Sequence, residues 1–228
     1  MMRGYYVGRL SGERLRQCYG IVSGRVKRYL EAEIDFVLRR LERNNHVLEL
    51  GCGYGRVTFR LAEVAKRVVG IDTATESLAL ARQIADPRSP CEFQEMDALE
   101  LTFDTSEFDR VVCVQNGICA FGGNQDVLLH QALRVTRPGG RVLFSTYSQR
   151  FWPHRLEWFA AQAAVGLVGP IDYERTGNGA IICKDGFHSG TVSPEAFLSL
   201  GKRLGVKCEV TEVDESSVFC EFVVPGTA

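Results

Sequence analysis

The amino-acid sequence predicts an α/β protein with a doubly wound, mostly parallel sheet and helices on both of its faces. Three observations support this prediction: apolar segments of strand length alternate with helical patterns, a glycine-rich turn follows the first of those segments, and a Pro-Gly-Gly turn precedes the fifth. Parallel strands need a crossover connection, which is usually a helix. With 228 residues and 45% hydrophobic content, the chain can bury one substantial core, so we expect a single domain over residues 1–228.

The first strand runs into a turn, within residues 47–55, in which Gly51, Gly53 and Gly55 alternate with other residues. Glycine adopts positive φ without steric cost and leaves the backbone open to a ligand, so this turn predicts a nucleotide-binding site. The spacing is not the dinucleotide pattern G-x-G-x-x-G, and Glu49 lies two positions before the first glycine. Because a carboxylate there would repel a pyrophosphate, the turn disfavours an NAD-linked oxidoreductase.

A second apolar strand, at residues 67–72, ends in the carboxylate of Asp72, about 20 residues after the glycines. An acidic residue at the tip of this strand can hold a ribose by accepting hydrogen bonds from both hydroxyls. The alternative is that Asp72 caps the helix predicted over residues 76–85, a role that Thr73 or Thr75 can fill equally well.

Three further segments complete the predicted core. The third strand covers residues 91–96. The fourth lies within residues 108–117, where an acidic residue precedes the apolar run and a polar loop follows it. Residues 133–144 contain a helix end, the Pro-Gly-Gly turn and the fifth strand. Proline cannot continue a helix and paired glycines permit a tight reversal, so a helix-to-strand connection is expected there.

In this order and spacing, residues 47–148 resemble the class I S-adenosylmethionine-dependent methyltransferases of the small-molecule type. The glycine turn resembles motif I of that family, residues 108–117 resemble motif IV, and residues 133–144 match the signature that follows it. The resemblance implies a Rossmann-like methyltransferase fold, with seven strands and an antiparallel C-terminal hairpin. It also implies S-adenosylmethionine as cofactor and S-adenosylhomocysteine as product.

The resemblance implies a set of cofactor-binding residues. Glu49 would lie near the cofactor's ammonium group, Asp72 would hold the ribose, and Asp97 would accept the amino group of adenine while Met96 or Ala98 packs on the ring. The full set that we expect to bind the cofactor is Tyr29, Glu49, Gly51, Cys52, Gly53, Gly55, Asp72, Thr73, Met96, Asp97, Ala98, Gln115 and Asn116.

The segments outside the cofactor-binding core, residues 46–148, are expected to determine the substrate. Residues 19–41 predict an amphipathic helix or two short ones, and in the family such a segment forms a lid, here within residues 1–45. The candidate cofactor contacts in it are Tyr5, Tyr6, Tyr19 and Tyr29. The alternative is that these tyrosines are ordinary packing residues.

After the fifth strand, residues 149–192 form a predicted substrate-specificity insertion. Aromatic walls exclude water around a sulfonium, and an arginine can orient a substrate carboxylate through two hydrogen bonds. The expected substrate-binding residues are Tyr147, Arg150, Phe151, His154, Arg155 and Trp158. Trp158 and Phe159 can instead bury the helix, and the glycine-rich residues 177–192 predict a hairpin. A helix over 194–204 and strands over 207–214 and 217–224 complete the C-terminal part, residues 193–228.

The expected reaction is an in-line displacement, in which an oxygen, nitrogen or sulfur nucleophile attacks the methyl carbon of the sulfonium. If the nucleophile carries a proton, His154 and His188 have the unperturbed pKa that suits a general base near pH 7. Asn116 is placed to hydrogen-bond the nucleophile or the cofactor's amino group. Both histidines can also be structural or surface residues.

Charge and composition favour a small-molecule acceptor. The net charge is −1 without a basic face, so nucleic acid is not an expected partner, and the N-P-P-Y motif of enzymes that methylate exocyclic amines of nucleic acids is absent. Two alternatives remain open: a protein, peptide or tRNA methyltransferase, and a non-catalytic module that binds S-adenosylmethionine.

Eight cysteines occur without C-x-x-C pairs or zinc spacing, so no metal site is predicted. The sequence has neither an apolar run of membrane-spanning length nor a signal peptide pattern, and a cytoplasmic monomer or homodimer is expected.

Overall fold

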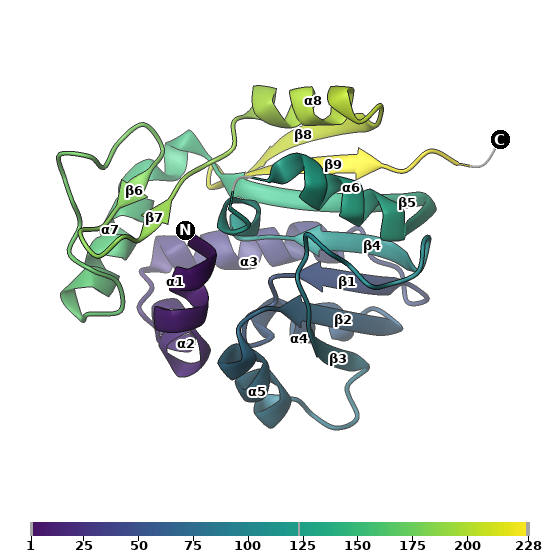
Figure 1. Ribbon diagram of the computed structural model, residues 1–228, viewed down its shortest axis with the longest axis horizontal. Coiled ribbons are helices and arrows are strands. Elements are labelled where there is room, and N and C mark those ends of the chain that lie inside the picture. The colour runs from purple at the N-terminus through teal and green to yellow at the C-terminus, as the bar shows by residue number, and fades with distance from the viewer. Residues whose placement is uncertain (1, 123, 227–228) are drawn as a thin grey trace.

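The computed structural model describes residues 2–122 and 124–226, which form a seven-stranded sheet in the order β3-β2-β1-β4-β5-β9-β8 (Figure 1). The strands are β1 (His46–Leu50), β2 (Arg67–Asp72), β3 (Cys91–Glu95), β4 (Phe108–Cys113), β5 (Thr136–Tyr147), β8 (Lys207–Val213) and β9 (Ser217–Val223). The pairs among β1 to β5 are parallel, and β9 is antiparallel to β5 and β8. The predicted mostly parallel sheet with an antiparallel C-terminal hairpin is confirmed.

Helices cover both faces of the sheet. They are α3 (Gly24–Leu38), α4 (Arg56–Ala62), α5 (Thr75–Ile84), α6 (Gln125–Val135) and α8 (Pro194–Arg203). Successive strand residues point to opposite faces, so Val47 and Val68 pack in a cluster with α3 and α4, whereas Leu48 and Val69 pack with α6 and α8. Burial on both faces explains why consecutive residues in these strands, such as Val47 and Leu48 or Val68 and Val69, are both apolar.

The strand order reverses between β1 and β4, because the chain winds outward to β2 and β3 on one side and to β5 on the other. Such a switch point leaves a crevice at the carboxyl ends of the strands, where ligands bind in open α/β sheets. The remaining elements gather at this end of the sheet in Figure 1. They are α1 (Met2–Arg9), α2 (Gly12–Gly20), η1 (Gly117–Ala120), η2 (Gln149–Phe151), α7 (Trp152–Ala164), β6 (Ile181–Ile182) and β7 (His188–Ser189).

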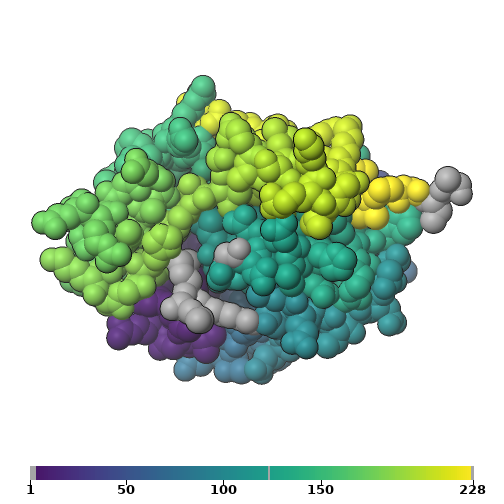
Figure 2. Space-filling model, turned by 45° about the horizontal axis from the view of Figure 1, so that its top comes forward, coloured from purple at the N-terminus to yellow at the C-terminus, as the bar shows by residue number. Residues whose placement is uncertain are grey.

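The N-terminal helices and the insertion after β5 are joined to each other; we call α1, α2, α7 and the β6–β7 hairpin the cap. The Tyr5 hydroxyl donates to the Asp185 carboxylate at 2.6 Å, and the Trp158 indole N–H donates to the Cys18 carbonyl at 3.1 Å. Figure 2 shows the N-terminal segment in purple beside the insertion in green. The antiparallel β6–β7 pairing confirms the predicted hairpin, whereas the division of the chain into lid, core and insertion stays a prediction.

The fifth strand differs from the sequence prediction, because β5 begins at Thr136 and includes the Pro-Gly-Gly segment instead of following it. Gly139 has a φ of +76° and donates its N–H to the Val224 carbonyl, which extends the pairing along the C-terminal segment. A Cβ at Gly140 would lie 2.6 Å from the Thr136 Cγ2 and 2.8 Å from the Asp109 carbonyl oxygen. Glycine is therefore required at position 140 for close packing of β5 against β4. Among the described residues, the helices are all too short or too polar to cross a membrane.

We predict that Gly140→Ala lowers the free energy of unfolding by about 1–3 kcal/mol, because the added methyl group overlaps backbone atoms that cannot move freely. Urea denaturation followed by circular dichroism measures the change. Gly177→Ala is the matched control, since no atom lies within 4 Å of a Cβ at that position. Equal stability of the two variants would contradict this account of the β4–β5 packing.

Candidate functional site

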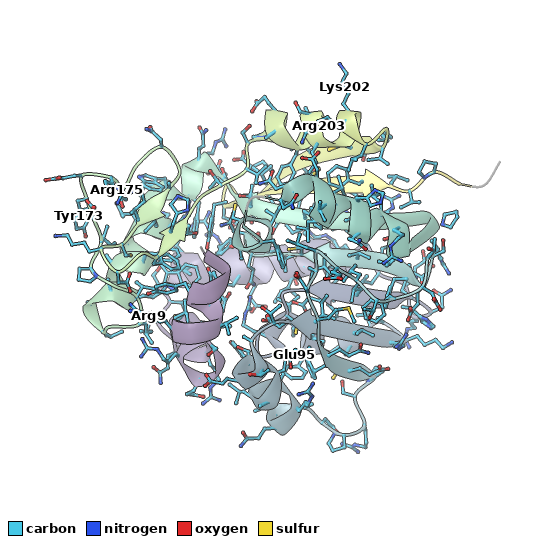
Figure 3. The ribbon with its side chains drawn as sticks, viewed as in Figure 1. Arg9, Glu95, Tyr173, Arg175, Lys202 and Arg203 are labelled. Atoms are coloured by element: carbon cyan, nitrogen blue, oxygen red, sulfur yellow. The ribbon has the colours of Figure 1, made fainter. Side chains whose placement is uncertain are left out.

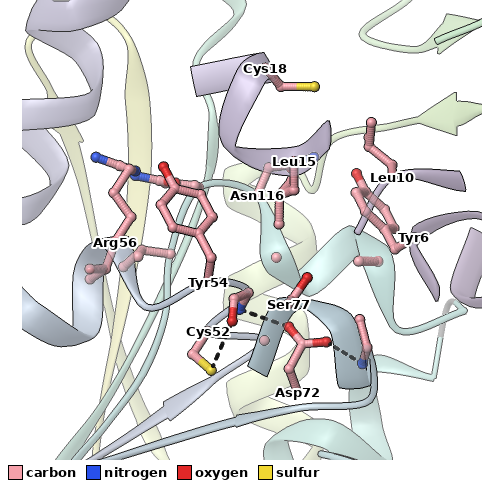
Figure 4. Close-up of a pocket in the computed structure, with 18 of the residues that line it drawn as sticks. Tyr6, Leu10, Leu15, Cys18, Cys52, Tyr54, Arg56, Asp72, Ser77 and Asn116 are labelled. Carbon is pink, nitrogen blue, oxygen red and sulfur yellow. Dashed lines mark hydrogen bonds between the residues drawn. The ribbon is translucent and has the colours of Figure 1, made fainter. Parts of the chain in front are cut away.

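A cavity lies at the carboxyl edge of the sheet, beside the switch point between β1 and β4 (Figure 4). The turn after β1 and the ends of β2, β3 and β4 form one wall, and residues of the cap form the opposite wall. Twelve of the residues predicted to bind cofactor or substrate line it: Glu49, Gly51, Cys52, Gly53, Asp72, Thr73, Met96, Ala98, Gln115, Asn116, Tyr147 and Trp158.

The three alternating glycines all adopt the left-handed backbone conformation, with φ of +72° at Gly51, +55° at Gly53 and +85° at Gly55. The N–H groups of Gly51 and Cys52 both donate to the Ile71 carbonyl, which ties the turn to the end of β2. The left-handed backbone explains the glycines physically, since other residues adopt it at a cost. Gly55 is the N-cap residue of α4 and lies just outside the cavity lining.

Asp72, the last residue of β2, holds the glycine turn with its carboxylate. One oxygen accepts the Gly53 N–H and the other accepts the Ala74 N–H, each at 2.8 Å (Figure 4). Burial raises the pKa of Asp72, while these N–H donors oppose the shift. Each carboxylate oxygen has a second lone pair, so the group can also accept two ribose hydroxyls. The N-cap residue of α5 is Ala74, so neither Thr73 nor Thr75 occupies the N-cap position.

Glu49 is a buried carboxylate on the same wall, with 3% of its surface exposed. Burial raises its pKa to about 7, and the hydrogen bond from the Thr58 hydroxyl and the nearby Arg56 charge oppose the shift. An ammonium group placed against Glu49 would favour the ionised carboxylate.

Arg56 was not among the predicted site residues, although it directly follows the last glycine. Its Nε and Nη2 atoms are buried without a hydrogen-bond partner among the described residues, and its guanidinium lies 4.8 Å from the ring centroid of Tyr19. Arg56, which is labelled in Figure 4, and Glu49 therefore present a cation and a carboxylate to the same cavity. This pair fits the carboxylate and ammonium groups of an amino acid, as the methionine part of S-adenosylmethionine has.

The cap supplies wall residues that no sequence motif indicated. Tyr6 and Tyr19 were named as candidates and do line the cavity. The lining residues that the sequence did not indicate include Leu10, Leu15, Cys18, Ser77, Phe121, Phe187 and Ser189. Most of these lie far apart in the sequence, so only the folded chain brings them together.

Several predicted residues lie behind the cavity wall. Tyr29 is fully buried, with its ring centroid 5.5 Å from that of Tyr147. Phe151 packs on Tyr29, and Arg155 is buried behind Tyr147. The Asp97 carboxylate accepts the Leu99 N–H at the end of β3 and is outside the lining.

The structure does not bring the two predicted general bases, or Arg150, to the cavity. His188 is exposed because successive strand residues face opposite sides, and in β7 it is Ser189 that lines the cavity. His154 packs beside the Phe151 ring, at 5.9 Å between centroids. The Arg150 side chain is 62% exposed and pairs with Glu215 at 2.9 Å.

Asn116 lines the cavity, but its side-chain amide already has protein partners. The Asn116 oxygen accepts the Thr146 hydroxyl at 2.7 Å, and its nitrogen donates to the Gly190 carbonyl at 3.0 Å. Gln115 and Asn116 have φ of 57° and 61°, so two successive non-glycine residues are strained at this wall. The Gln115 N–H donates to Glu33 at 2.8 Å. The Asn116 side chain thus joins the core to the cap, and its catalytic role stays a prediction.

Comparisons with known proteins agree with this geometry. Residues 47–140 match the family model described as a methyltransferase domain. A putative methyltransferase of Bacillus subtilis, YqeM, is 33% identical over 110 residues, which cover 47% of this chain and 44% of the relative. A ubiquinone biosynthesis O-methyltransferase of Hydrogenovibrio crunogenus is 29% identical over 127 residues, which cover 55% of this chain and 52% of the relative. The chain thus spans about half the length of these two relatives.

Among solved structures, the PH0226 protein of Pyrococcus horikoshii superposes with a TM-score of 0.67 at 22% identity, over 96% of this chain and 97% of that one. This likeness shows that the two share a fold. The glycine turn, the sheet order and the matched domain all indicate a family whose cofactor is S-adenosylmethionine. The core of the chain therefore resembles the class I S-adenosylmethionine-dependent methyltransferases.

Proposed function

We propose that this protein transfers the methyl group of S-adenosylmethionine to a small-molecule acceptor by in-line displacement. The observation that carries the proposal is the wall on which Glu49, Arg56, Asp72 and the glycine turn line one cavity. Asp72 would hold the ribose, and Glu49 with Arg56 would hold the amino-acid end of the cofactor. Met96 and Ala98 would lie against the adenine. When bound, the cofactor supplies an electrophilic methyl group.

The opposite wall supports a small acceptor. Tyr6, Trp158 and Phe187 enclose the cavity from the cap, and Tyr147 closes it from the end of β5. A polypeptide or a folded RNA would have to displace α1, α2 or the hairpin to enter. The net charge of −1 offers little attraction to phosphates. The name of the Hydrogenovibrio crunogenus relative, a ubiquinone biosynthesis O-methyltransferase, favours a small acceptor as well.

The protein's contribution to the reaction would be alignment and exclusion of water. Aromatic side chains form a cavity of low polarity, in which a sulfonium is weakly solvated and reaction toward neutral products is favoured. Holding the two reactants in line lowers the barrier by several kcal/mol without an acid or a base. Because neither His154 nor His188 lines the cavity, the geometry favours alignment over general-base catalysis by these residues.

We predict that Asp72→Ala weakens binding of S-adenosylhomocysteine by about 100-fold or more, because two hydrogen bonds to a carboxylate contribute about 1.5–3 kcal/mol each. Isothermal titration calorimetry measures the affinity, and thermal unfolding checks that the variant is folded. Asp86→Ala removes an equally charged surface carboxylate that pairs with Arg88, and serves as the control. Unchanged affinity in a folded Asp72→Ala variant would contradict the ribose assignment.

A second prediction concerns pH. Because burial raises the pKa of Glu49 to about 7, an ammonium group that needs the ionised carboxylate should bind more weakly below pH 7, by up to about tenfold per pH unit. In the protein without ligand, the free energy of unfolding should fall as pH rises from 4.5 to about 7, because Glu49 then ionises in the unfolded chain before it ionises in the folded one. Calorimetry in buffers of different ionisation enthalpy should detect proton release on cofactor binding at pH 6. Glu49→Gln should abolish that release, and proton release that persists in this variant would disprove the role of Glu49.

A further inference from the structure

Arg155 is a buried charged residue that has no part in the cofactor binding proposed above. It lies on α7 with 1% of its surface exposed, and none of the ion pairs found among the described residues includes it. Its guanidinium donates instead to the carbonyls of Gly179 and Ser189, and to the Ser189 hydroxyl at 2.9 Å. A buried charge without a counter-ion is costly, so its place in the fold calls for an explanation.

The guanidinium lies directly behind the cap wall of the cavity. Its central carbon is 4.2 Å from the ring centroid of Tyr147 and 5.9 Å from that of Phe159. Both rings, together with Ser189, line the cavity. Aromatic material of low polarity therefore separates the charge from the cavity, and screens its field much less than water would.

The groups around Arg155 do not cancel its charge near pH 7. The titratable groups that interact with it are Tyr147 on β5, Cys119 on η1, Tyr29 on α3 and Tyr6 on α1. Burial raises the pKa of each of them, so all four are neutral at that pH. Glu33 acts on Tyr29 and Tyr147, but it is not among the groups found to act on Arg155. The lining carboxylates Glu49 and Asp72 lie on the wall formed by the glycine turn and the end of β2, which we call the cofactor wall.

We propose that the methyl acceptor reacts as an anion, with a negatively charged oxygen or sulfur carried on an apolar or aromatic group, and that Arg155 selects this ionised form. This inference rests on the proposed methyl transfer. The acceptor's lone pair forms the new bond to the methyl carbon, the carbon–sulfur bond breaks, and its electron pair stays on sulfur. The anion and the sulfonium both become neutral, and no proton moves.

This proposal accounts for the composition of the cap wall. Within the part of the chain that the structure describes, the lining residues contributed by the cap include tyrosines, Trp158, Phe159, Phe187, Gln162 and Ser189, but no histidine or carboxylate. An acceptor that enters ionised needs no general base, whereas a protonated amine would need one and would be repelled by Arg155.

The test uses 4-nitrophenol, whose ionisation changes its visible absorbance, bound to protein saturated with S-adenosylhomocysteine. A nearby positive charge stabilises the anion, so the bound probe should ionise about one pH unit or more below the free probe. Arg155→Gln should remove most of this shift. Arg203→Gln is the matched control, because Arg203 lies on α8 (Figure 3), has 53% of its side chain exposed and pairs with Asp126 at 2.8 Å. It should leave the shift unchanged.

A second measurement needs only the unmodified protein and stays decisive if Arg155→Gln fails to fold. Benzoate should bind to the S-adenosylhomocysteine complex at least about tenfold more tightly than benzamide, its neutral analogue of similar shape. Equal or weaker binding of benzoate, or a bound probe that ionises at or above the pH of the free probe, would overturn the proposal. Binding of S-adenosylhomocysteine is measured first, so failure of the methyltransferase assignment is seen separately.

Discussion

The hydrogen bond from the Gly53 N–H to the Asp72 carboxylate joins the turn after β1 to the end of β2. It lies at the carboxyl edge of the sheet, beside the switch point where the strand order reverses. It fixes the left-handed glycine backbone against a half-buried carboxylate, and both then face the same cavity. The other site features follow from this junction. Glu49 precedes the turn on β1 and Arg56 follows it on α4, so the turn places opposite charges close to each other.

The cap gives this junction its second wall. Tyr5 and Asp185 are 180 positions apart, yet their hydrogen bond joins α1 to the β6–β7 hairpin. Asn116, after the end of β4, donates to the Gly190 carbonyl just after the hairpin. Hydrogen bonds therefore join the parts of the cap to each other and also join the cap to the core. The carboxylates that line the cavity lie on the cofactor wall, while Arg155 stands behind the cap wall. This separation of charge is what a cationic methyl donor and an anionic acceptor would require.

Much of the core could be predicted from the sequence because its signals are local. Apolar runs predict buried strands, and the spacing of Gly51, Gly53 and Gly55 predicts their turn. The cap could not be predicted in this way, since its contacts join distant segments. Arg150 and Arg155 were equal candidates five positions apart, but η2 leaves Arg150 in solvent and α7 buries Arg155. His188 and Ser189 differ only in the face of β7 from which they project, and sequence composition does not indicate that face.

A crystal structure of the protein with S-adenosylhomocysteine would test the account most directly. We expect the ribose hydroxyls on Asp72, the amino-acid end between Glu49 and Arg56, and the sulfur directed toward the aromatic wall that contains Tyr147. A ligand bound outside the cavity, or bound with its sulfur turned away from the cap wall, would contradict the assignment of the two walls.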